Sequence, residues 1–128
     1  MSNHGADTRA RRRSYRRGLS AETLAAMLLR LKGYRILARR YRTPLGEIDL
    51  VARRGAHFAF VEVKARPEEA EVLTARQRER IRRAAEAWLA TAESRGILPG
   101  DYSASFDLVI VMPRRIPRHL PRAFGDGV

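Results

Sequence analysis

The chain has 128 residues, of which 45% are hydrophobic, and it suits a globular protein with one hydrophobic core. It contains no cysteine, which excludes disulfides and thiolate chemistry, and no apolar run approaches the roughly 20 residues that a membrane-spanning helix needs. Lysine and arginine number 26 against 14 acids, a net charge of +12, and this balance favours a polyanionic partner, nucleic acid before membrane.

The N-terminal residues 1–17 carry six arginines and one acid, with almost nothing to bury. We predict a disordered basic arm here, which either adds salt-dependent affinity for phosphates or is a solvated tail without a role. No apolar stretch follows these arginines, so the arm is not a secretory signal, and we expect a cytoplasmic protein. Residues 18–125 are expected to form a single domain.

The first predicted helix runs from Ser20 to Lys32, with a serine at its start and a glycine just past its end. Its apolar residues recur at helical spacing and are expected to face the core: Leu24, Met27, Leu28 and Leu31. Glu22 lies in the first turn, where the helix dipole alone is a sufficient reason for an acid.

Three strands follow, at residues 34–42, 47–53 and 58–64, and the last two form a hairpin. A second helix is predicted over residues 75–95, with a buried stripe of Ile81, Ala84, Ala85, Trp88 and Ala92. The apolar segment 103–113 is a last strand, and the rest of the chain is a basic tail broken by prolines. The order α-β-β-β-α-β predicts an α/β protein in which two main helices flank a mixed β-sheet.

The hairpin turns at Gly55-Ala56, where a glycine in the first position suits a two-residue type II′ turn. This turn fixes which residues of the two strands face each other. One face is then wholly apolar, with Ile48 opposite Val63, Leu50 opposite Val61 and Ala52 opposite Ala59. The other face pairs Val51 with Phe60, Asp49 with Glu62 and Glu47 with Lys64.

The Glu47–Lys64 pair would be an ordinary cross-strand ion pair, whereas Asp49 opposite Glu62 is unusual. Cβ atoms of directly opposed residues lie about 5 Å apart, where two carboxylates must share a proton, find a cationic partner or hold a metal ion. Carboxylate oxygens with room for water are what Mg²⁺ prefers. A structural network of arginines around the acids is the alternative, since the chain has 24 arginines.

The segments "GEIDLVA" (46–52) and "FVEVKAR" (60–66) resemble the signature of the YraN-like family of small bacterial proteins. That family is similar to the PD-(D/E)XK superfamily of nucleases, which includes restriction endonucleases and archaeal-type Holliday junction resolvases. The likeness runs from about Gly18 to Phe124 and includes both predicted helices and the last strand. It implies a restriction endonuclease-like core of three layers.

By this resemblance Asp49 and Glu62 are metal ligands, Lys64 is the lysine of the E-x-K motif, and Glu22 completes the carboxylate shell around the metal. The implied cofactor is Mg²⁺, or Mn²⁺ in its place. These residues would together form the catalytic site.

Two further positions each have two explanations. Gln77 falls where related nucleases place a lysine or glutamine facing the site, which would make it catalytic, but Thr74 and Gln77 also form a capping box for the second helix. Asp107, on the last strand, resembles an acid that is frequent in the family, and pairing with an arginine is its expected role.

The resemblance implies metal-dependent hydrolysis of phosphodiester bonds, in DNA more than in RNA, with branched or structured DNA as the resolvase-like substrate. Arginines are expected to hold backbone phosphates without reading the base sequence: Arg42, Arg66, Arg76, Arg80 and Arg83. A two-fold homodimer would suit a branched substrate. The alternatives are a non-catalytic nucleic-acid-binding module on the same scaffold and a protein-interaction role.

Overall fold

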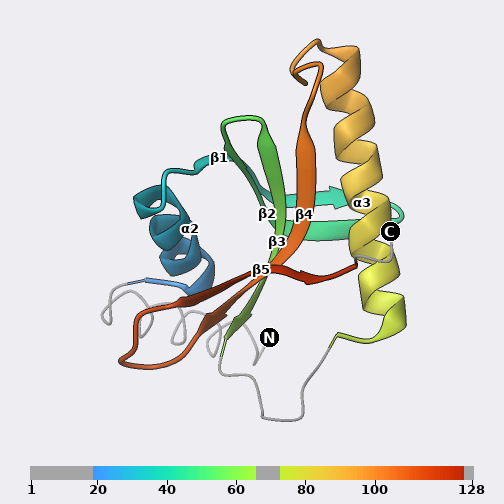
Figure 1. The fold of residues 1–128 in the computed structure, drawn as a ribbon. Coiled ribbons are helices and arrows are strands. Elements are labelled where there is room, and N and C mark those ends of the chain that lie inside the picture. Colours follow the sequence, from blue (N-terminus) through green and yellow to red (C-terminus); the bar gives the residue numbers. More distant parts are fainter. Residues whose placement is uncertain (1–18, 66–72, 126–128) are drawn as a thin grey trace, which may run out of the picture.

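In the computed structural model, which describes residues 19–65 and 73–125, a five-stranded sheet forms the centre of the fold (Figure 1). Its strands lie side by side in chain order: β1 (Arg35–Thr43), β2 (Gly46–Arg54), β3 (His57–Ala65), β4 (Ser103–Val111) and β5 (Arg118–Phe124). The neighbours β3 and β4 are parallel, and the long helix α3 (Ala75–Ser94) lies between them in the chain, as a parallel crossover requires. The other neighbouring pairs are antiparallel.

The helix α2 (Ala21–Leu31) covers one face of the sheet and α3 covers the other, so the fold has three layers (Figure 1). The core under α2 contains the sheet residues Leu50, Ala52, Ala59, Val61 and Val109. The core under α3 contains Val51, Phe58 and Phe60. These layers confirm the predicted α/β class, the mixed sheet and the order of the first six elements.

The buried face of α2 agrees only in part with the predicted one, since Leu24 and Leu28 pack half-buried against the core as predicted. Ala25, Ala26 and Leu29 are fully buried, while Met27 and Leu31 are 44% and 85% exposed. Hydrophobicity favours the leucines and the methionine, but small alanine side chains let the helix backbone lie close to the sheet and pack densely there. Within the described residues, neither helix is both long and apolar enough to cross a membrane.

The helix α3 begins with the predicted capping box. The Thr74 hydroxyl accepts the backbone N–H of Gln77 at 3.1 Å, and the side-chain oxygen of Gln77 accepts the backbone N–H of Thr74 at 2.7 Å. The predicted stripe is confirmed, since its alanines and isoleucine are buried and Trp88 packs half-buried against the rings of Phe58 and Phe60.

The strand β5 forms within the segment predicted to be a tail, so that prediction is wrong. The strand pairs antiparallel with β4, and the pairing is irregular opposite Asp107. Pro121 and Arg122 lie in this irregular part, and Arg122 is in the left-handed region with a φ of 52°. Proline cannot donate to a ladder and is tolerated at sheet edges and irregularities, and β5 is the outermost strand.

The hairpin of β2 and β3 has the predicted two-residue turn and register. Its paired residues run from the turn to Leu50 and Val61, and Gly55 has the positive φ, 62°, that a type II′ turn requires. Beyond this pair the two strands, both described throughout, share no further ladder pair. Ile48 packs under α3 instead of facing Val63 as predicted. The strands therefore separate where the acids of the predicted site begin.

The edge strand β1 is also irregular. Its pairing with β2 shifts between Ile36 and Ala38, and Arg40 has a φ of 52°. Such interruptions bend a strand. In Figure 1 the far end of the β1–β2 hairpin reaches toward α3, which contacts both strands.

Gly46, at the start of β2, touches the backbone of α3. A Cβ atom there would overlap the carbonyl group of Arg80, which cannot move without moving the helix. We therefore expect Gly46→Ala to lower the free energy of unfolding by about 2–3 kcal/mol. Urea denaturation measures the loss. Gly100→Ala is the control, because a Cβ atom at Gly100 meets open space; equal stability of the two variants would contradict the close approach.

Candidate active site

Asp49 and Glu62 lie next to each other at the point where β2 leaves β3. Asp49 is on β2 where that strand leaves β3, and its Oδ2 accepts the backbone N–H of Val63 at 2.7 Å. Burial first, and then the charge of Asp49 and a hydrogen bond to it, raise the pKa of Glu62 to about 8. At neutral pH the carboxyl group of Glu62 therefore keeps its proton.

Lys64 lies two residues after Glu62 on the same strand, and its Nζ is 3.9 Å from Glu62 Oε2. The predicted ion pair of Lys64 with Glu47 is wrong: the carboxylate of Glu47 lies 3.8 Å from Arg42, its partner on β1. The separation of β2 from β3 accompanies the change, because the two strands no longer pair at Glu47 and Lys64. Lys64 is thereby left beside the acid pair.

Glu22 is held on α2 by two arginines of β1. Its carboxylate lies 3.1 Å from Arg39 and 3.2 Å from Arg40. Within residues 19–65 and 73–125, no three acids or histidines are close enough together to hold one metal ion. The fold thus brings together Asp49 and Glu62 and leaves Glu22 in a separate group of ion pairs.

The remaining predicted site residues lie at the surface. Gln77 is exposed at the start of α3, where its side chain caps the helix. Three of the predicted phosphate-binding arginines are exposed along the same helix: Arg76, Arg80 and Arg83. The fourth, Arg42, is exposed on β1. Arg66 and the basic arm of residues 1–17 lie outside the described residues.

The acid pair suits a hard divalent cation. Two neighbouring carboxylates supply oxygen donors of the kind that Mg²⁺ and Mn²⁺ take, and they leave other coordination positions to water or substrate. The pKa of Glu62 is raised because the site is buried and because Asp49 already carries a charge beside it, and a nearby cation would lower that pKa again. Lys64 is one such cation, but at 3.9 Å it compensates only in part.

We expect Glu62→Gln to stabilise the metal-free protein at high pH. The pKa of Glu62 is about 8 in the folded protein against its usual 4.5, so the folded state binds an extra proton between these values. The stability of the wild type therefore falls as the pH rises through this window. Glutamine cannot ionise, so the variant should exceed the wild type by roughly 2–4 kcal/mol at high pH and equal it in acid.

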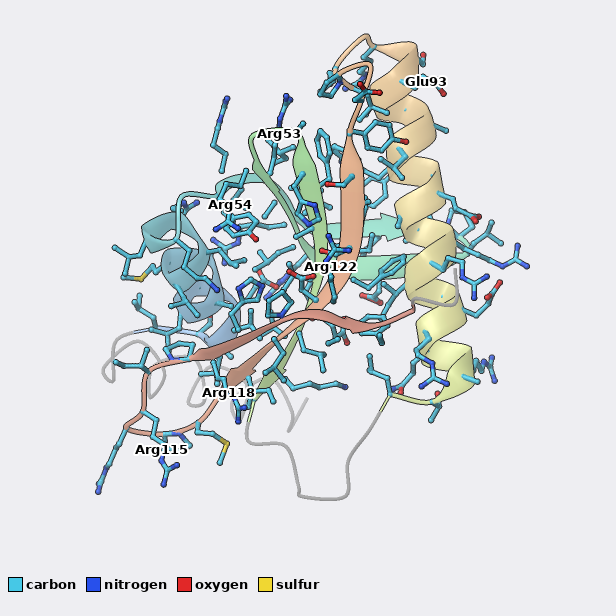
Figure 2. The ribbon with its side chains drawn as sticks, in the orientation of Figure 1. Arg53, Arg54, Glu93, Arg115, Arg118 and Arg122 are labelled. Atoms are coloured by element: carbon cyan, nitrogen blue, oxygen red, sulfur yellow. The ribbon has the colours of Figure 1, made fainter. Side chains whose placement is uncertain are left out.

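Urea denaturation in EDTA from pH 4 to pH 9 measures this difference. Glu93→Gln, at the exposed end of α3 (Figure 2), is the control and should follow the wild type at every pH. A constant difference between Glu62→Gln and the wild type over the whole range would contradict the buried acid pair.

A second polar cluster, around Asp107 on β4, is not predicted by the sequence. Asp107 is fully buried and accepts hydrogen bonds from Ser105 Oγ at 2.6 Å, His119 Nε2 at 2.7 Å and the backbone N–H of Arg122 at 3.1 Å. These groups replace the arginine side chain expected as its partner. Burial alone would raise the pKa of Asp107, but the hydrogen bonds outweigh burial and hold the pKa below its usual value.

The hydrogen-bonded chain extends beyond these groups. Lys32, just after α2, contacts the second ring nitrogen of His119, and His57 bridges the hydroxyls of Ser103 and Ser105 at 2.7 and 2.8 Å. Burial lowers the pKa of His57, which keeps this ring neutral between the two hydroxyls. The cluster ties α2, β3, β4 and β5 together. Its only sequence signal is an acid and a serine within an apolar strand, because the pairing of β5 cannot be inferred from local patterns.

The three layers, the mixed sheet and the acids on the hairpin define a protein of the restriction endonuclease-like fold. Its structure resembles that of Hjc, a Holliday junction resolvase from the archaeal hyperthermophile Archaeoglobus fulgidus. The TM-score is 0.50 and the sequence identity 22%, with 78% of this chain and 72% of that chain covered. A family model matches residues 21–111, and the chain belongs to UPF0102, an uncharacterised protein family.

Curated relatives support this membership and the resemblance to the YraN-like family. The UPF0102 protein of Parvibaculum lavamentivorans is 54% identical over 87% of this chain and 83% of its own length. That of Methylorubrum populi is 55% identical over 92% of this chain and 94% of its own length. The protein of Rhodopseudomonas palustris strain BisB5 is 52% identical, with 87% and 84% covered.

Proposed function

We propose that the protein is a metal-dependent endonuclease that hydrolyses phosphodiester bonds in DNA. The observation that carries the proposal is the acid pair of Asp49 and Glu62, with Lys64 beside it, where β2 leaves β3. Two acids this close keep a proton on Glu62 and cost stability when both are ionised, and a bound cation would offset that cost. The fold supports the proposal, since a Holliday junction resolvase shares it.

Asp49 and Glu62 would hold Mg²⁺ or Mn²⁺, whose chemistry is to polarise a phosphate oxygen and to lower the pKa of a bound water. The backbone N–H of Val63 orients the Asp49 carboxylate for this task. Lys64 carries its ammonium group to within 3.9 Å of Glu62, where it would stabilise negative charge that develops on the scissile phosphate.

Glu22 and Gln77 have secondary roles in this proposal. Glu22 would join the carboxylate shell through a bound water once a phosphate of the substrate replaces it as the partner of Arg39 and Arg40. Gln77, exposed at the N-terminus of α3, would contact the substrate beyond the metal ion.

DNA suits the charge of the protein, and the arginines exposed on α3 would hold its backbone phosphates. The resolvase of the same fold supports a branched or structured substrate, on which a homodimer would place two active sites. A DNA substrate in bacteria also places the protein in the cytoplasm.

The test is the cutting of labelled linear, flapped and four-way DNA by the purified protein in Mg²⁺, Mn²⁺ or EDTA. We expect cutting with either ion, faster on the branched substrates than on the linear duplex, and none in EDTA. If none of the substrates is cut in either Mg²⁺ or Mn²⁺, the enzymatic proposal is overturned.

A non-catalytic DNA-binding module is the second candidate. The two arginines that engage Glu22 favour it, because the described part of the site then has two neighbouring acids rather than three. This candidate predicts DNA binding that weakens steeply with salt and is unchanged by Asp49→Asn, without any cutting.

A further inference from the structure

A cavity of about 430 Å³ lies between α3 and the paired ends of β4 and β5. Three aromatic rings line it, those of Phe60, Phe106 and Phe124, and their centroids follow one another at 5.9 and 5.5 Å. Gly125 closes one wall. A Cβ atom on Gly125 would lie 2.8 Å from the Phe106 ring, so a glycine is needed for the backbone to come this close. The volume lies within the range of small-molecule binding sites.

The rim of the cavity carries both donors and an acceptor. Arg82 and Glu86 border it from α3, and Arg122 borders it from β5, beside the edge of β4 (Figure 2). The backbone N–H of Arg122 is bound to the buried Asp107, which fixes the position of this residue. Aromatic rings below guanidinium and carboxylate groups match a heterocycle with apolar faces and a polar edge.

We propose that this cavity binds one unpaired nucleobase of a DNA strand. Charge selects this occupant, because the arginines at the rim and the net charge of +12 attract a polyanion. Phe60 lies two residues before Glu62 on the same face of β3, about 7 Å along the strand. A base in the cavity would therefore bring its own phosphates close to the acid pair.

Such a cavity gives selectivity for DNA structure without reading the base sequence. A base inside a duplex must lose its pairing and stacking before it can enter, whereas an unpaired base at a branch point has less to lose. The inference deepens the proposed function by naming what the enzyme would recognise, and it rests on that function for the role of the bound strand.

The test uses Asp49→Asn protein in EDTA, so that neither cutting nor metal binding enters the measurement. A single strand of thymidines competes with a labelled strand for the protein, and so does an abasic strand with the same number of phosphates. We expect the thymidine strand to bind about tenfold more tightly. Its binding should also change the fluorescence of Trp88, the one tryptophan of the chain, which packs on Phe60.

Two variants alter the cavity in different ways, so that one remains informative if the other does not fold. Phe124→Leu removes one of the rings, and Ala104→Leu fills the space from an exposed position on β4. Both should reduce the preference for the thymidine strand to less than about twofold. The control Tyr102→Leu removes an exposed aromatic ring outside the cavity and should keep the preference.

Equal affinity for the two strands in the parent protein would overturn the proposal, and so would an unchanged preference in both cavity variants. A Trp88 response to an apolar dye but not to the thymidine strand would also overturn it, by assigning the cavity to an apolar ligand. Cutting decides the proposed function separately. If the protein cuts DNA without preferring the thymidine strand, only the cavity proposal fails. If it prefers the thymidine strand but does not cut, only the proposed nuclease activity fails.

Discussion

Asp49→Asn and Lys64→Ala are each expected to slow metal-dependent DNA cutting by at least about 10²–10³-fold while the protein stays folded. Asparagine removes a negative charge from the metal site, yet its side-chain oxygen can still accept the backbone N–H of Val63. Lys64→Ala removes the ammonium group beside Glu62. Single-turnover cutting of a four-way junction in Mg²⁺ measures both losses, and circular dichroism verifies the fold.

Glu47 provides the matched control for these substitutions. It lies on the same strand as Asp49, but its partner is the exposed Arg42. Glu47→Gln should therefore cut as fast as the wild type. DNA affinity in EDTA should be retained by Asp49→Asn, which separates loss of chemistry from loss of binding. Cutting that survives both Asp49→Asn and Lys64→Ala would remove these residues from the mechanism.

Asp107→Ala is expected to lower the free energy of unfolding by about 3–5 kcal/mol. The substitution leaves Ser105 and His119 without the acid that accepts from them, in a site with no access to water. It also frees the backbone N–H of Arg122, so β5 loses a link to β4. Urea denaturation at pH 7 measures the loss.

The pH dependence gives a second test of Asp107. The pKa of Asp107 is lowered in the folded state. The ionised carboxylate therefore contributes its full stabilisation above the usual pKa of 3.8, and this stabilisation disappears only as the pH falls through the lower folded pKa. The difference in the free energy of unfolding between the wild type and Asp107→Ala should therefore be constant above about pH 5 and become smaller in acid. Asp101→Ala, an exposed acid just before β4, is the control. Equal stability of the two variants would contradict the role of the cluster.

The acid pair could be predicted because it depends on local rules. A two-residue turn at Gly55-Ala56 fixes the register as far as Leu50 and Val61. The next residues, Asp49 and Glu62, are close together as predicted, although they are not the directly opposed ladder pair that the sequence predicts. The same rules fail at Ile48, where β2 leaves β3. That departure accompanies the contact of Gly46 with α3, which joins segments far apart in the chain.

The errors in the fold also come from packing between distant segments. The periodicity of α2 is correct, but Ala25 and Ala26 face the sheet because their small size permits a close approach. A hydrophobicity pattern contains no information on the space available. The strand β5 contains Pro121, which indicates a loop until its place at the edge of the sheet is known.

The surroundings of Glu22 could not be predicted from the resemblance to the family. The motif gives the residue type on the first helix, but the distance from that helix to the hairpin depends on how α2 packs. In this chain Arg39 and Arg40 of β1 lie within reach and bind the carboxylate first. The sequence therefore gives the residue type at Glu22, whereas its partners depend on how α2 packs against β1.

The interruptions of the two outer strands also determine how the protein meets copies of itself. β1 is broken by its shift after Ile36 and by the left-handed Arg40, and β5 by Pro121 and Arg122. A strand from another molecule needs a regular row of free N–H and C=O groups to extend a sheet, and neither edge offers one. Within the described residues, both edges of the sheet are thereby unsuited to edge-to-edge aggregation with another copy of the chain.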